Sequence, residues 1–418
     1  MSVSATSPDQ EVRRLIGEGY DAALADGMLV VSHVPYVRGP GRIGRASLLV
    51  PLSMVAGRVS APRTHQAWWT GKEPTEVDGR PLDGMKAHGS TTRCLEGLPP
   101  AIMICCKPRG REFRDHHEFV TTYVGLLGAP AVTLDPSVTA RFRAPRTSPP
   151  TKEGPFAYLD TASPRAALGA VNARVKGRTV GIVGLGGTGS YVLDLVSKCS
   201  VDAIHLYDDD LLEQHSAFRA PGATTIDDLR ARRTKVDHFA SVYRGIHRHV
   251  MPHAIRIDGR TAAMLDPLDF VFLCIDDAAA KPPIIERLAR RAIPYVDVGM
   301  GLHLTDRGIA GAIRTTFVEP GEHAVAESIP TVGDADGVYA TNIQICELNA
   351  LNAALAVVAW KRHLGFYASN RSQSNSVFVV EDGRLHTDER DAPLVSVRRA
   401  SGAAVGACPE PDHEDEDA

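Results

Sequence analysis

One glycine-rich stretch near the middle of the chain has the residue types and spacing that point most directly to chemistry. Gly184, Gly186 and Gly189 follow the G-x-G-x-x-G pattern, which lets a backbone turn tightly, approach a phosphate and pack a helix against its strand. An apolar strand is expected before the loop at 179–183, and a helix after it at 190–197. Because the first N–H groups of a helix and its positive dipole end stabilise an anion, this stretch predicts a nucleotide site.

Acidic and basic residues follow this loop in positions that suit a nucleotide. Asp208 ends the next apolar strand, about 20 residues after the glycines, where an acid reaches a ribose. Arg219 and Lys235 come next, and Asp276 ends a later apolar strand. Two cations and a carboxylate beside a helix N-terminus suit a triphosphate with Mg²⁺, because the cations offset the charge on the leaving pyrophosphate and the acid holds the metal.

Two other interpretations of these charges stay open. An NAD-dependent oxidoreductase would use the glycine loop and Asp208, but it leaves Arg219, Lys235 and Asp276 unexplained. Taken singly, Arg219 and Lys235 also fit ordinary solvated charges, because they lie in an arginine-rich segment. The full set of charges therefore favours ATP over NAD.

Alternating strands and helices must position these side chains. The apolar pattern predicts strands at 179–183, 203–207, 250–257, 270–275 and 294–299, and helices at 190–197, 226–245 and 281–292. Such alternation predicts an α/β fold with a doubly wound, Rossmann-like parallel sheet, whose ligands bind at the carboxyl ends of the strands. A hairpin at 302–304 and 311–318, a polar loop at 319–338, a long helix at 341–364 and a terminal hairpin at 376–380 and 384–386 follow.

The chain is expected to divide into a smaller N-terminal α+β domain at 1–145, a proline-rich linker at 146–160, a nucleotide-binding core at 161–387 and a disordered acidic tail at 388–418. In the first domain, helices are predicted at 12–24 and 116–127, with apolar strands between them. That order matches a ubiquitin-conjugating-like fold, although many α+β domains share it. The last ten residues hold six acids and no lysine or arginine, which predicts disorder.

Composition limits the partners and the compartment. The net charge of −4 gives no basic footprint for nucleic acid. The seven cysteines are odd in number and never spaced C-x-x-C, so neither a disulfide framework nor a zinc site is expected. No apolar stretch is long enough to span a bilayer. We therefore expect a cytoplasmic protein that binds neither nucleic acid nor membrane.

Five segments occur in the order of a known family: GIVGLGGTGS, LYDDDLLEQHSAFR, RRTKVDHF, VFLCIDD and IPYVDVGM. They resemble the ThiF/MoeB/HesA superfamily, the adenylyltransferase core of ubiquitin-activating enzymes, over about residues 166–365. With its extra N-terminal domain, the chain is similar to proteins of bacterial ubiquitin-like conjugation operons. The resemblance implies an ATP- and Mg²⁺-dependent homodimer that adenylates the C-terminal glycine of a ubiquitin-like protein for a conjugating-enzyme-like partner. A non-catalytic scaffold of this fold is the alternative, but every charged motif residue is retained.

The resemblance also implies a role for each matching residue. Four glycines would line the phosphate loop: Gly184, Gly186, Gly187 and Gly189. Asp208 would bind the ribose, and Asp276 would ligate Mg²⁺. Arg219 and Lys235 would hold the polyphosphate. Asp210 matches the second acid of the family's D-x-D. Ser216 stands beside the nucleotide, where the family usually has asparagine.

No thioester on this chain is predicted. The loop at 319–338, near which many relatives carry their thiol, contains only the hydroxyls of Ser328 and Thr331. Cys346 alternates with apolar residues in a predicted helix, which indicates a buried position. We therefore expect an acyl-adenylate that passes directly to a partner or through a hydroxyl ester.

Overall fold

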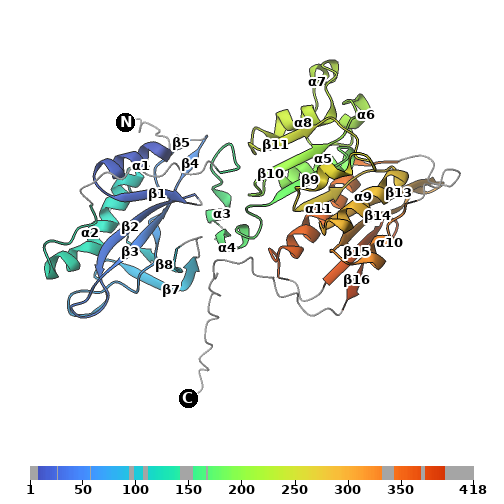
Figure 1. Cartoon of the computed structure of the whole chain (residues 1–418). Coiled ribbons are helices and arrows are strands. Elements are labelled where there is room, and N and C mark those ends of the chain that lie inside the picture. Colours follow the sequence, from blue (N-terminus) through green and yellow to red (C-terminus); the bar gives the residue numbers. More distant parts are fainter. Residues whose placement is uncertain are drawn as a thin grey trace. The chain divides into compact units, whose positions relative to one another are not determined.

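The computed structural model of the chain describes residues 8–25, 27–56, 58–93, 98–106, 112–141, 154–165, 168–331, 343–368 and 372–390. Two compact units are present (Figure 1). The N-terminal unit takes its described residues from 8–141 and 158–173, and the C-terminal unit from 154–157 and 174–390.

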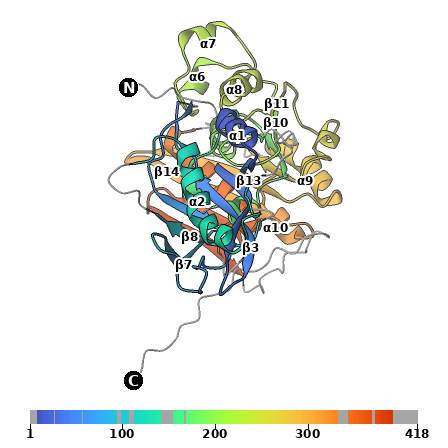
Figure 2. The ribbon, with the colours of Figure 1, turned by 90° about the vertical axis from the view of Figure 1, so that its left-hand side faces the viewer.

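The N-terminal unit is an antiparallel sheet with two helices over one face. Its strands are β1 (Asp21–Ala25), β2 (Met28–Val37), β3 (Ile43–Pro51), β6 (Gln66–Trp69), β7 (Lys86–Arg93) and β8 (Ala101–Cys105), in the order β1-β2-β3-β6-β8-β7, and a small hairpin pairs β4 (Met54–Val55) with β5 (Arg58–Val59). Figure 2 shows α1 (Pro8–Gly17) and α2 (His116–Leu134) in front of the sheet. Short helices α3 (Ala162–Arg165) and α4 (Gly169–Asn172) also belong to this unit.

The helix predicted at 12–24 is wrong in its second half. The helix ends at Gly17, and Asp21–Ala25 pairs antiparallel with β2. Gly19 has φ +91°, a conformation that stops a helix and that glycine adopts without strain. Strand pairing therefore overrides the helical spacing of the apolar residues.

The C-terminal unit contains an eight-stranded sheet in the order β11-β10-β9-β12-β13-β14-β15-β16. The parallel strands are β11 (Val250–His253), β10 (Ala203–Tyr207), β9 (Thr179–Val183), β12 (Phe270–Leu273) and the start of β13 (Tyr295–Thr305). The antiparallel strands are β14 (Gly308–Val318), β15 (Ser372–Val379) and β16 (Arg384–Arg390). The chain order reverses between β9 and β12, which is where ligands bind in such sheets.

Helices cover both faces of this sheet, as the predicted doubly wound fold requires. Apolar side chains of α5 (Gly187–Val196), α8 (Lys235–Tyr243) and α11 (Cys346–His363) pack into one core. Those of α9 (Lys281–Arg290), α10 (His323–Glu327) and the 3-10 turn η1 (Ala262–Leu265) pack into another on the opposite face. The remaining short elements are α6 (Gln214–Ala217), α7 (Ile226–Arg230) and the 3-10 turn η2 (Ala278–Ala280).

Two predicted elements of this unit need correction. The single, mostly exposed helix at 226–245 is two helices, α7 and α8, because Arg232 has φ +47° and Thr234 caps α8 by accepting the N–H of Asp237. Six of the nine residues of α8 are buried. The strands at 294–299 and 302–304 are one continuous strand, β13, which pairs with β14 along its length.

Some predictions fall on segments that the structure leaves undescribed. Residues 332–342, in the polar loop and the start of the predicted long helix, lie outside the described residues, and so do 391–418 of the predicted tail. The terminal strand β16 continues to Arg390, past the predicted end of the core. Across the described part of the chain, no helix is both long and apolar enough to cross a membrane.

Candidate functional site

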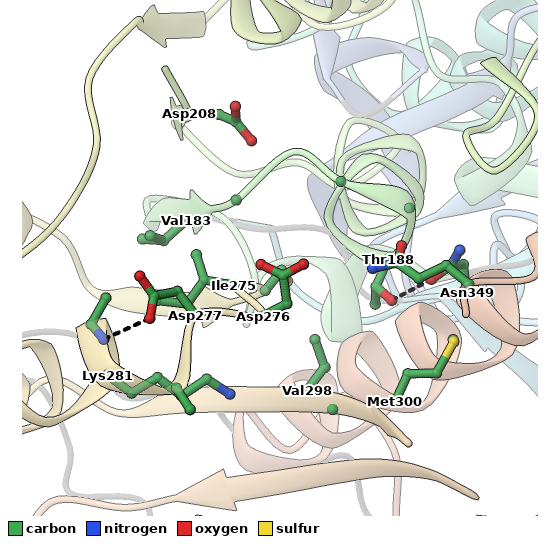
Figure 3. A pocket seen from close by; sticks show the side chains of 18 of the residues that line it. Val183, Thr188, Asp208, Ile275, Asp276, Asp277, Lys281, Val298, Met300 and Asn349 are labelled. Carbon is green, nitrogen blue, oxygen red and sulfur yellow. Dashed lines mark hydrogen bonds between the residues drawn. The ribbon is translucent and has the colours of Figure 1, made fainter. Parts of the chain in front are cut away.

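A cavity of about 530 Å³ lies at the carboxyl ends of the parallel strands, beside the point where strand order reverses (Figure 3). The glycine loop, the loops after β10 and β12, the wall of β13 and β14, and the start of α11 line it. The lining includes eight residues predicted for the site: Gly184, Gly186, Gly187, Asp208, Asp210, Arg219, Lys235 and Asp276. Gly189 and Ser216 are not lining residues. The fold thus brings most of the predicted site together.

The glycines of the loop differ in what a side chain would meet. Gly184 has φ +89°, and a Cβ there would lie 2.7 Å from the carbonyl oxygen of Cys274. A Cβ on Gly189 would lie 1.9 Å from the carbonyl oxygen of Gly184, so this glycine lets α5 pack against its strand although it does not line the cavity. A Cβ on Gly186 would meet nothing within 4 Å. That open position, together with an α5 N-terminus that has no side-chain cap, leaves room for an anion.

Asp208 organises the glycine loop. Its Oδ2 accepts the N–H of Leu185 at 2.6 Å, and its Oδ1 accepts the N–H of Asp210 at 2.9 Å. Burial raises the pKa of Asp208, and the nearby Lys235 ammonium opposes that rise. Two of the roughly four lone-pair positions of a carboxylate are therefore used by the backbone, which leaves acceptor capacity for a ribose hydroxyl.

Lys235, the first residue of α8, faces the acidic segment after β10. Its Nζ is 2.5 Å from Oδ2 of Asp210 and 3.7 Å from Oδ1 of Asp208. The carboxylates of Asp208, Asp209 and Asp210 come close enough together to hold a cation. Because the Lys235 ammonium already faces two of them, it neutralises the charge that a metal would need.

Arg219 lines the cavity and carries a buried, unpaired donor atom. Its Nε is buried and, within the described residues, has no hydrogen-bond partner. A buried N–H of a guanidinium costs stability when it stays unpaired, so this position favours an anionic ligand. Ser216, three residues earlier on α6, is 3% exposed. Its hydroxyl also has no partner in the described part, but it lies outside the cavity lining, so the expected contact of Ser216 with the nucleotide has no support from its position.

Asp276 and Asp277 follow β12 and differ in their environment. Asp276 is exposed and faces the cavity, with Asp208 and Asn349 on different sides of it (Figure 3). Asp277 caps η2 by accepting the N–H of Ala279 at 3.0 Å, and it also forms an ion pair with Arg256. Asp277 is thus held by its contacts with η2 and Arg256, whereas Asp276 is the more exposed of the two at the surface of the cavity.

Sequence reasoning missed the charged wall formed by α9, β13 and β14. Lys281 and Arg314 line the cavity, and both contact the buried Asp297. The signal was present, since Asp297 and Arg314 are single charges inside apolar strands, where an unpaired charge is costly. Arg256 was missed as well: the strand predicted at 250–257 ends at His253, and Arg256 lies in the loop that follows it.

The start of α11 completes the cavity. Asn349, which is 1% exposed, accepts a hydrogen bond from Oγ1 of Thr188 on α5 at 2.8 Å (Figure 3). Cys346 is half-buried at the first position of α11, not fully buried as predicted, and its Sγ lies 2.8 Å from the Tyr191 hydroxyl. That hydrogen bond raises the pKa of Tyr191 to about 12. Cys346, Ser328 and Thr331 are not among the lining residues.

Two family models match the chain. Residues 168–361 match the ThiF family, so this part of the chain is a ThiF family domain, and the extra N-terminal part, residues 10–161, matches a domain of unknown function (DUF6791). The ThiF match confirms the recognised superfamily, and it covers nearly all of the parallel sheet and the glycine loop.

Curated relatives and solved structures also resemble the chain. It is 24% identical over 207 residues to ubiquitin-like modifier-activating enzyme 5 of Caenorhabditis elegans, a match that covers 46% of this chain and 48% of that protein. The enzyme of the same name from Drosophila erecta is 25% identical over 187 residues, covering 40% and 42%. The chain spans about half the length of the curated relatives it matches. Among solved structures, E. coli MccB with ATP is 16% identical with a TM-score of 0.41, covering 54% of this chain and 67% of that one, and PaaA is 18% identical with a TM-score of 0.42, covering 52% and 66%.

Proposed function

We propose that this chain is an ATP-dependent adenylyltransferase that activates the C-terminal glycine carboxylate of a ubiquitin-like protein for a conjugating partner. The observation that carries the proposal is that Arg219, whose buried Nε has no partner in the described residues, lines the same cavity as the uncapped N-terminus of α5. Together they offer a guanidinium and backbone donors to a polyphosphate. Relatives named ubiquitin-like modifier-activating enzymes support the choice of substrate class.

The lining residues fit ATP as a substrate. The space above Gly186 admits a phosphate, Asp208 keeps acceptor capacity for the ribose, and Arg219 with Lys235 offsets polyphosphate charge. Asp276 fits Mg²⁺, which is usually held by one or two carboxylates plus phosphate oxygens. When bound, that ion would supply positive charge to the leaving pyrophosphate.

The reaction needs little acid–base catalysis from the protein. An oxygen of the substrate carboxylate attacks the α-phosphorus, a P–O bond forms there, and the bond to pyrophosphate breaks. A C-terminal carboxylate has a pKa of about 3.5 and is already ionised at neutral pH, so no general base is needed. The cavity residues act by orienting the carboxylate and by neutralising charge.

The acyl-adenylate would pass to a partner without a thioester on this chain. Burial raises the pKa values of the Cys106, Cys199 and Cys274 thiols, which disfavours the thiolate that a transfer step needs. Cys346 lies outside the cavity lining. Incubation with ATP and the ubiquitin-like partner, followed by non-reducing electrophoresis, should give no thiol-cleavable adduct; an adduct lost on Cys346→Ala contradicts this part of the proposal.

Calorimetry with ATP–Mg²⁺ and with NAD tests the proposal directly. We expect ATP to bind and NAD not to bind, and we expect Arg219→Gln to weaken ATP binding by about tenfold or more because a charge-assisted contact is lost. Arg230→Gln is the matched control, since Arg230 is a nearby exposed arginine that pairs with Asp227 outside the cavity. Binding of NAD with no binding of ATP would overturn the proposal in favour of an oxidoreductase.

A further inference from the structure

Two buried charges, Lys281 and Asp297, and the half-buried Arg314 form one wall of the cavity. Asp297 on β13 is 0% exposed; Nζ of Lys281 lies 2.7 Å from its Oδ1, and Nη2 of Arg314 lies 2.6 Å from its Oδ2. Both cations line the cavity, and the Arg314 side chain is 18% exposed. Two cations sharing one carboxylate leave an excess of positive charge in the wall. Because the Asp297 carboxylate offsets only one of these two cations, the wall favours an anion in the cavity.

Contacts through α11 connect this wall to the N-terminus of α5. A Cβ on Gly299 would lie 3.0 Å from Nη2 of Arg314, so glycine lets the guanidinium lie against the strand. The carbonyl oxygen of Gly299 accepts from Nδ2 of Asn352 at 3.0 Å. One turn earlier on α11, Asn349 accepts from Thr188 in the first turn of α5 at 2.8 Å. The wall is thus linked, through these contacts, to the place where the nucleotide phosphates are proposed to bind.

The two groups of cations stand on different sides of the glycine loop. Arg219 and Lys235 follow β10, whereas Lys281 and Arg314 lie on α9 and β14, beyond β12 in the sheet order. A polyphosphate held by the first group leaves the second group for another anion. A single excess positive charge matches a monovalent anion, and a planar guanidinium matches the two oxygens of a carboxylate.

We infer that Arg314, positioned by Asp297 and Lys281, recognises the free α-carboxylate at the C-terminus of the peptide to be adenylated. This inference rests on the proposed function and adds the residue that selects a free C-terminus. An internal peptide bond or an amidated C-terminus carries no negative charge, so the wall would discriminate against both.

The test uses the full chain with AMPCPP, a non-hydrolysable ATP analogue, and two small probes, glycylglycine and glycylglycinamide. Saturation-transfer NMR measures the binding of each probe. We expect the wild type to bind glycylglycine at least about tenfold more tightly than the amide, as one charge-assisted contact predicts. Arg314→Gln should lose this preference, and Arg314→Lys, which keeps the charge, should retain part of it.

Controls separate this inference from the proposed function. Arg307→Gln, in the exposed turn between β13 and β14, should keep the wild-type preference. If the wild type does not bind AMPCPP, the proposed function fails. If it binds AMPCPP but does not distinguish glycylglycine from its amide, or if Arg314→Gln keeps the preference, the inference about Arg314 fails alone. If Arg314→Gln does not fold, an undiminished preference in the folded Arg314→Lys variant would also overturn it.

Discussion

Most of the charged side chains around the cavity are fixed by a partner, and the partner decides what each can do. Lys235 is shared by Asp208 and Asp210, and Asp208 is held by backbone N–H groups of the glycine loop. Arg219 differs, because the Nε of its guanidinium is buried without a partner in the described residues. This unpaired N–H sets Arg219 apart from Lys235 and Asp208.

Asp276 provides the sharpest test of the magnesium assignment. Asp276→Asn removes a carboxylate charge but almost no volume, so the melting temperature should change little, because Asp276 is exposed. We expect Mg²⁺ to tighten ATP binding to the wild type, and we expect the variant to lose most of that gain and to lose ATP–pyrophosphate exchange. Asp306→Asn, at the turn outside the cavity, is the control. An unchanged Mg²⁺ effect in the Asp276 variant would exclude Asp276 as a ligand.

The buried His116 allows a prediction of how the stability of the N-terminal unit depends on pH. Its ring is 0% exposed, Nε2 lies 3.2 Å from both the Ser53 nitrogen and the Pro51 carbonyl oxygen, and burial lowers the pKa of His116 to about 4. The unfolded chain, with an ordinary His pKa near 6.5, binds more protons than the folded one between pH 6.5 and 4. The contribution of His116 to stability is therefore complete above pH 6.5 and is lost as the pH falls, by about 2 kcal/mol at pH 5.

Urea unfolding at pH 7 and pH 5 measures this effect. In a Trp360→Phe background, the remaining tryptophans, Trp68 and Trp69, both report on the N-terminal unit. His116→Gln keeps an acceptor for the Ser53 N–H but does not titrate, so it should lose about 2 kcal/mol of the pH dependence. An equal pH dependence in both proteins would show that another group is responsible.

Among the elements, the glycine loop contains one glycine that we expect to matter for binding, Gly186, and one that we expect to matter for folding, Gly189. Gly186→Ala adds a methyl group where nothing lies within 4 Å, so the free energy of unfolding should change by less than about 1 kcal/mol. The same methyl group narrows the phosphate position, and we expect ATP affinity to fall by about tenfold. Gly189→Ala puts a Cβ 1.9 Å from the Gly184 carbonyl oxygen and should destabilise the protein by about 3 kcal/mol. Calorimetry should therefore show weaker ATP binding by Gly186→Ala, and thermal unfolding should show a lower stability for Gly189→Ala but not for Gly186→Ala.

Short, strongly apolar elements could be predicted from the sequence, because local pattern alone determines them. The strands β9 and β10 match their predicted bounds. The helix predicted at 226–245 failed because a single residue, Arg232, takes a left-handed conformation that no apolar pattern reveals. The prediction divided β13 into two strands because the glycines at 299 and 301 resemble a break. In the structure, pairing with β14 keeps the whole segment extended.

The part of the candidate site that follows motifs was predictable, and the part that depends on tertiary contact was not. The glycines and Asp208, Arg219, Lys235 and Asp276 meet at one cavity because the carboxyl ends of parallel strands share an edge. The wall containing Lys281 and Arg314 depends on α9, β13 and β14 meeting around Asp297, which no spacing in the sequence indicates.

At the scale of the whole molecule, one edge of the C-terminal unit stands out. β11 is the last strand of the eight-stranded sheet, so one of its sides has no neighbour within that sheet. Large apolar side chains are exposed on β11 itself and in the segment between β10 and β11, which contains α6, α7 and α8. They are Phe218 (78%), Ile226 (59%), Val242 (54%) and Met251 (43%). An open strand edge with exposed apolar groups is a common place for a second chain to pair.

We therefore predict a homodimer that forms through this edge of the ThiF domain. Light scattering at micromolar concentration should give twice the mass of the 44.9 kDa chain. Ile226→Asp combined with Val242→Asp should give a folded monomer, because burying two carboxylates at an apolar contact is costly, whereas each is tolerated at an exposed position. Leu304→Asp is the matched control, since Leu304 is 73% exposed on the hairpin of β13 and β14 and should leave the dimer intact. A monomeric wild type would refute the dimer, and a dimer that survives the double substitution but is lost with Leu304→Asp would move the interface to the other end of the sheet.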